Sequence, residues 1–108
     1  MKIITLHTPV DINELYNLLQ QKLNKLFHER RQSDINFTVE RKDDVIDIYG
    51  PEIYEGFLFS MTLNGTELRI TRSEHYVDDV NSLTIESILN DLFKNLAGDL
   101  GTDLVQEG

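Results

Sequence analysis

The spacing of apolar residues along the chain predicts two amphipathic helices, one near each end. In the first, apolar residues recur at the i, i+3, i+4 and i+7 positions that form one stripe on a helix. This stripe comprises Ile12, Leu15, Tyr16, Leu19, Leu23, Leu26 and Phe27. Asp11 is placed to cap the helix, and Glu14 stands at its third position, as in a capping box. Leu18 falls outside the stripe, and we expect it to be half exposed.

The last helix is predicted from the same spacing. Its stripe comprises Ile85, Ile88, Leu89, Leu92 and Leu96. We expect Ser82 or Thr84 to cap its start, and Gly98 to end it, because glycine is common just after a helix. Residues 99–108 contain two glycines and few apolar residues. We therefore predict that they form a frayed, acidic C-terminal tail.

Between the helices, alternation of apolar and polar residues predicts two β-hairpins. The first has a tight turn at Asp43-Asp44, which keeps its apolar residues on one face. This turn also sets Glu40 opposite Asp47 on the polar face. Like charges that face each other across two strands are unfavourable, so we expect compensation from Arg69 of the second hairpin.

The second hairpin is predicted to turn at Asn64-Gly65, a pair typical of a type I′ turn, in which both central residues have positive φ. This turn places Met61 opposite Leu68. The apolar residues that then share one face are Phe57, Phe59, Met61, Leu63, Leu68 and Ile70. A slip of one residue would move all of them to the other face, so the pattern favours one orientation of the hairpin.

Together with a short strand over residues 2–7, which Pro9 stops, these elements give the order β-α-β-β-β-β-α. We predict an α+β fold in which a mostly antiparallel sheet packs one face against both helices, so that two layers form. The other face of the sheet is polar and can lie in water. The chain of 108 residues is long enough for a single domain, which we place at residues 1–98.

The negative charge of the chain is concentrated in its C-terminal third. The formal net charge is −9. From Glu74 onward there are eight acidic residues and one basic residue, Lys94, which gives −7, whereas residues 1–73 hold eleven acidic and nine basic residues, which gives −2. Such a distribution attracts basic partners and repels nucleic acids and anionic membranes. It also favours solubility, whatever the function.

No motif in the chain indicates a reaction. There is no cysteine, which excludes disulfides and thiolate chemistry. The three histidines, His7, His28 and His75, are scattered, and none accompanies a G-x-S-x-G nucleophile motif. Neither predicted helix start carries a glycine-rich phosphate loop. We therefore expect no catalytic residue and no cofactor, and we favour a role that is not enzymatic.

The densest group of polar side chains is the run from Glu74 to Asp79, which includes His75 and Asp78. Carboxylates and an imidazole at such close spacing can hold a divalent cation. However, the spacing does not match an EF-hand loop, and acidic residues just before a helix are favoured by the helix dipole. We expect no specific metal site here.

These observations favour a small acidic interaction module that docks on a basic protein partner, as inhibitors, immunity proteins, chaperones and nucleic-acid mimics do. The residues expected at the docking face are Tyr76, Asp78, Asp79, Glu86 and Asp91. Further apolar surface is expected at Leu18, Tyr49 and Leu58.

Two alternatives stay open. One is a small-ligand binder or enzyme that uses the polar sheet face or a pocket between sheet and helices. The other is a structural subunit that assembles, for example as a homo-oligomer, through an edge strand or through Leu18. No segment approaches the roughly 20 apolar residues that span a bilayer, and the N-terminal apolar run is too short for a signal peptide. We expect a soluble, cytoplasmic protein without a membrane or direct nucleic-acid partner.

Overall fold

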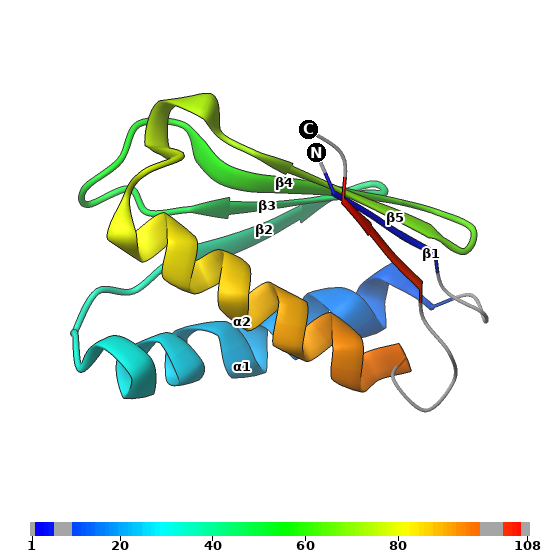
Figure 1. The fold of residues 1–108 in the computed structure, drawn as a ribbon, viewed down its shortest axis with the longest axis horizontal. Coiled ribbons are helices and arrows are strands. Elements are labelled where there is room, and N and C mark those ends of the chain that lie inside the picture. Colours follow the sequence, from blue (N-terminus) through cyan, green and yellow to red (C-terminus); the bar gives the residue numbers. More distant parts are fainter. Residues whose placement is uncertain (1, 6–9, 98–102, 107–108) are drawn as a thin grey trace.

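The computed structural model describes residues 2–5, 10–97 and 103–106. The elements in chain order are β1 (Lys2–Thr5), α1 (Ile12–Arg31), β2 (Thr38–Lys42), β3 (Val45–Tyr49), β4 (Phe57–Asn64), β5 (Glu67–Arg72), the short 3-10 helix η1 (Glu74–Tyr76), α2 (Val80–Ala97) and β6 (Asp103–Gln106). The strands form one antiparallel sheet in the order β2-β3-β4-β5-β1-β6. Both helices lie against the same face of this sheet (Figure 1). The predicted α+β fold with two layers is therefore confirmed.

A single apolar core fills the space between the sheet and the helices. The buried apolar residues of the helices, among those whose side chains the structure describes, are Leu15, Leu19, Leu23, Phe27, Ile85, Ile88, Leu89, Leu92 and Phe93. This set confirms the predicted stripe of α1, and Leu18 is half-buried as expected. Phe93 is a core residue that the predicted stripe of α2 left out. The side chain of Leu96 lies outside the described part of the chain. Each large side chain that is removed from water stabilises the fold by roughly 1.5–3 kcal/mol.

The two helices begin in the same way, but only the first start was predicted correctly. Asp11 caps α1, and its Oδ1 accepts a hydrogen bond from the Asn13 amide at 3.0 Å. In α2, the Oδ2 of Asp79 accepts from the Ser82 amide at 3.0 Å, so α2 begins before the predicted caps at Ser82 or Thr84. An aspartate just before the first turn is as good a cap as serine. Pro9 and Gly98, the predicted ends of a strand and a helix, lie outside the described residues.

The first hairpin has the predicted register. Asp43 takes a left-handed conformation, with φ of 54°, in the turn between β2 and β3. Glu40 consequently lies opposite Asp47. The expected compensation by Arg69 is wrong, because Arg69 forms an ion pair with Glu67 on its own strand.

The second hairpin has a different register from the predicted one. Its central residues are Gly65 and Thr66, and Asn64 pairs with Glu67. Only Gly65 has positive φ here, at 63°, which is the pattern of a type II′ turn with glycine first. Met61 therefore lies opposite Ile70 rather than Leu68. Because the shift is two residues, the same side chains still face the core.

An irregularity in the β3–β4 pairing brings Leu58 into the core. The register shifts between Ile48, which faces Phe59, and Tyr49, which faces Phe57. Leu58 lies between these pairs and is fully buried, although alternation predicted it on the polar face. Leu58 is therefore unable to provide the apolar surface that we expected of it.

At the other side of the sheet, Asp103–Gln106 forms strand β6 and pairs with β1, with Ile3 opposite Val105. We had predicted a frayed tail over residues 99–108, and the structure contradicts this for these four residues. The physical reason is that β1 would otherwise present an unpaired row of backbone donors and acceptors, which a further strand satisfies. Residues 99–102 and 107–108 lie outside the described part of the chain.

The free edge of β2, at the opposite side of the sheet, is covered by α1. Asn24 accepts a hydrogen bond from the Phe37 amide at 2.7 Å and donates one to the Phe37 carbonyl at 2.9 Å. Gln20 donates to the Val39 carbonyl at 3.2 Å. Because the backbone groups at Phe37 and Val39 are already bonded to α1, strand addition is disfavoured at this end of β2.

Candidate functional site

Two segments that are distant in sequence are joined at one end of the molecule. They are residues 50–56, between β3 and β4, and residues 73–83, which comprise η1 and the start of α2; we call them together the acidic end. The rings of Tyr54 and Tyr76 pack edge to face, with centroids 4.8 Å apart. The Tyr76 hydroxyl also accepts from the Glu55 amide at 3.0 Å and donates to its carbonyl at 3.1 Å. In Figure 1 both segments lie on the left, beside the yellow start of α2.

The hydroxyl of Tyr54 connects the same two segments a second time. It donates to the Oδ2 of Asp79 at 2.7 Å and accepts from the side-chain amide of Asn81 at 3.1 Å. Burial of the ring, followed by the hydrogen bond to Asp79, raises the pKa of Tyr54 above that of a free tyrosine. The hydroxyl therefore remains a donor at neutral pH. Asp79 consequently holds the acidic end together, in addition to capping α2.

The outer surface of the acidic end combines carboxylates with apolar side chains. Four acidic residues there are exposed: Glu52, Glu55, Glu74 and Asp78. Three large apolar side chains are exposed in the part of the chain that the structure describes, Ile53 by 52%, Val80 by 53% and Leu83 by 44%, and all three belong to these two segments. Neither segment contains a lysine or an arginine. This surface is therefore both strongly negative and partly apolar.

The predicted docking residues are divided between this surface and the rest of α2. Tyr76, Asp78 and Asp79 belong to the acidic end, where Asp78 is exposed and the other two are half-buried. Glu86 instead forms an ion pair with Arg72 of β5, at 3.1 Å. Asp91 forms an ion pair with Arg30 of α1, at 2.6 Å.

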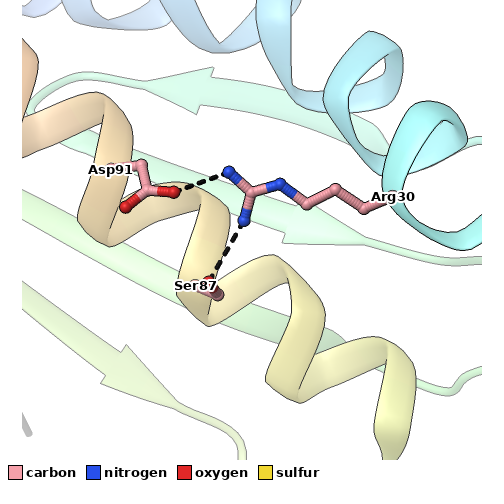
Figure 2. A network of polar contacts seen from close by, with 3 residues as sticks. All are labelled: Arg30, Ser87 and Asp91. Carbon is pink, nitrogen blue, oxygen red and sulfur yellow. Dashed lines mark hydrogen bonds and ion pairs between the residues drawn. The ribbon is translucent and has the colours of Figure 1, made fainter.

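Figure 2 shows this second ion pair together with a bond from the same guanidinium to Ser87, at 3.1 Å. Arg72 comes from the sheet and Arg30 from the neighbouring helix. Glu86 and Asp91 are thus turned toward different elements, and both neutralise a cation within the chain. They do not extend the surface around Asp78.

Sequence reasoning missed the contribution of residues 50–56. No role was predicted for Glu52, Ile53, Glu55 or Val80. One signal was present, because Ile53 follows Gly50-Pro51 and Glu52 and belongs to no predicted strand or helix that would bury it. The contact between Tyr54 and Tyr76 carries no such local signal.

Other kinds of site have little support within the described residues. There, no three His, Cys, Asp or Glu side chains are grouped so that they could hold a metal ion. The absence of a metal site at Glu74, His75, Asp78 and Asp79 nevertheless stays a prediction. No helix in the described ranges combines the length and the apolarity needed to cross a membrane. Comparisons with protein-family models, with curated proteins and with solved structures found no match.

Proposed function

We propose that this protein is an interaction module that docks the acidic end onto a basic protein partner. The observation that carries the proposal is the coincidence of exposed apolar and exposed acidic side chains on two segments that tyrosines hold together. Single exposed apolar residues scattered over a surface need no explanation, whereas apolar residues gathered at one place within a polar rim are typical of interfaces. In such an interface the charges steer association, and burial of Ile53, Val80 and Leu83 supplies affinity.

The proposal favours docking over nucleic-acid mimicry. A mimic needs carboxylates at regular separations along one face, and Glu86 and Asp91 are both bound to arginines of the chain. An inhibitor, an immunity protein or a chaperone needs only a complementary partner surface. The proposal includes a cytoplasmic location.

The experiment compares two pairs of isosteric substitutions. Glu52→Gln with Asp78→Asn removes two charges from the acidic end, and Asp43→Asn with Asp44→Asn removes two from the tip of the first hairpin. Asparagine tolerates the left-handed conformation of residue 43, so the control should fold normally. Partners are cross-linked to each variant in a lysate of the native host, identified by mass spectrometry, and then measured individually by surface plasmon resonance.

For a specific partner, the substitutions at the acidic end should slow association roughly three- to tenfold at low salt, with a smaller effect at high salt, because steering is screened over about 10 Å at 0.1 M. The hairpin control should have little effect. A second variant, Ile53→Ser with Val80→Ser, should accelerate dissociation. If the two pairs slow association equally, net charge alone is responsible and the docking surface is wrong.

A further inference from the structure

A cavity lies on the polar face of the sheet, next to the acidic end. It has a volume of about 270 Å³, and its lining residues are Thr38, Glu40, Tyr49, Pro51, Tyr54 and Gly56. Thr38 and Tyr49 are directly opposite each other on β2 and β3. The last three lining residues belong to the segment 50–56, so the cavity and the proposed docking surface share one wall.

This segment is held firmly at Gly50. The Tyr54 amide donates to the Gly50 carbonyl at 2.7 Å. A Cβ atom on Gly50 would lie 2.8 Å from the Tyr54 ring and 3.2 Å from the Phe37 ring, so only glycine allows this packing. The wall of the cavity is therefore formed before any ligand binds.

The cavity is lined by one carboxylate, that of Glu40, and the carboxylate of Asp47 lies on the neighbouring strand. Glu40 lies opposite Asp47, next to the pair of Thr38 and Tyr49. The Tyr49 hydroxyl donates to the Oδ2 of Asp47 at 3.2 Å, whereas the Oδ1 of Asp47 is buried without a hydrogen-bond partner among the described residues. In the same part of the chain, no arginine or lysine forms an ion pair with either carboxylate. Opposed like charges are unfavourable, and a bound cation would relieve them.

The shape and chemistry of the cavity select among cations. It is smaller than the roughly 300–1,000 Å³ of pockets for drug-sized ligands, which suits a single side chain. A guanidinium is planar, carries five donors that can bind carboxylates, and stacks on aromatic rings such as those of Tyr49 and Tyr54. An ammonium group offers a point charge without the stacking plane. Anionic ligands are repelled by Glu40 and Asp47.

We propose that this cavity receives the guanidinium group of an arginine on the partner that docks at the acidic end. The inference rests on the proposed function, since the docked partner supplies the arginine. It extends that function by naming a residue type that the partner must present, and by adding Glu40 and Tyr49, which line the cavity, to the residues that recognise it. Asp47 contributes through its charge and its hydrogen bond with Tyr49.

The test uses N-acetyl-L-arginine amide as a probe and N-acetyl-L-citrulline amide as its neutral analogue of nearly the same shape. Binding of each to the full-length protein is followed by NMR chemical shifts of the backbone amides. The arginine probe should cause saturable shifts at Thr38, Tyr49 and Gly56, and the citrulline analogue should bind at least tenfold more weakly. Glu40→Gln and Asp47→Asn should each weaken binding of the arginine probe about tenfold, whereas Asp44→Asn should leave it unchanged.

Tyr49→Phe provides a second variant, which keeps the ring and removes only the hydroxyl that contacts Asp47. It should weaken the arginine probe less than Asp47→Asn does. Equal binding of the two probes, or shifts that are unaffected by Glu40→Gln and Asp47→Asn, would overturn the inference. Because the probe needs no partner, the outcome is separate from that of the docking experiment. The arginine probe could bind while the substitutions at Glu52 and Asp78 leave association with the partner unchanged. That result would refute the proposed function but leave the guanidinium site.

Discussion

The helix-covered face of the sheet and the acidic end are stabilised by different interactions. On the covered face, side chains such as Leu19, Leu23 and Phe59 are almost entirely removed from water. At the acidic end, apolar side chains remain in water, and a ring contact and a few hydrogen bonds of Tyr54 and Tyr76 join the segments. The covered face accounts for stability and exposes no surface for binding. The acidic end exposes apolar side chains, so substitutions there can alter binding without unfolding the core.

The largest effect should come from the core. Phe59→Ala should lower the free energy of unfolding by about 3–5 kcal/mol, because it leaves a cavity among fully buried neighbours. Phe57→Ala is the matched control, since Phe57 is on the same strand but only half-buried, and its effect should be clearly smaller. Urea unfolding at equilibrium measures both. A nearly neutral Phe59→Ala would contradict the packing of β4 beneath the helices.

An intermediate effect should come from the polar contacts of the acidic end. Tyr54→Phe removes the hydroxyl that bonds Asp79 and Asn81, and we expect a loss of about 1–3 kcal/mol because one partner is a charged group. Tyr16→Phe is a suitable control, since among the described residues the Tyr16 hydroxyl bonds only to the side chain of Gln20, one turn along the same helix. If the two substitutions have equal effects, the bonds of Tyr54 do not hold the segments together.

Raising the pH above about 10 should weaken the contacts of Tyr54 at the acidic end, but not the packing of the apolar core. Burial and the bond to Asp79 raise the pKa of Tyr54 in the folded state. Above pH ~10 the unfolded chain loses this proton first, so the folded state binds more protons and its stability falls as pH rises. Replacement by phenylalanine removes this contribution. Tyr54→Phe should therefore reduce the slope of stability against pH above pH ~10 relative to the unsubstituted protein, and an unchanged slope would contradict the assignment.

The sequence predicted most of the covered face, because its information there is periodic, but it missed Leu58 and Phe93. The stripe of α1 and the alternation of the first hairpin each follow from local spacing, and both agree with the structure. The second hairpin kept its buried face but not its register, because Gly65 takes the first central position of the turn instead of the second. A shift of two residues leaves the same side chains on the buried face, so the alternation of apolar and polar residues cannot reveal it.

The acidic end could not be predicted in the same way, because it depends on a contact between two segments. No spacing rule connects Tyr54 with Tyr76, or places the Asp79 carboxylate where it caps α2 and accepts from Tyr54 at once. The sequence did direct attention to the acidic run after Glu74. It did not indicate which carboxylates bind arginines of the chain, and this distinction now separates Asp78 from Asp91.

The smallest effect on stability should come from the ion pair between Arg30 and Asp91. The side chains of Arg30 and Asp91 are exposed by 34% and 56%, and ion pairs exposed to this extent contribute about 0.2–1 kcal/mol at most. Asp91→Asn should therefore lower stability slightly at low salt, but should leave association with the partner unchanged, because Asp91 is already neutralised by Arg30. Asp78→Asn should slow association, since Asp78 is exposed and contributes to steering, and it should change stability only through the weak interaction of its charge with the start of α2. The test measures the free energy of unfolding and the association rate for both variants. If Asp91→Asn slows association as much as Asp78→Asn, the docking surface extends along α2 and is not confined to the acidic end.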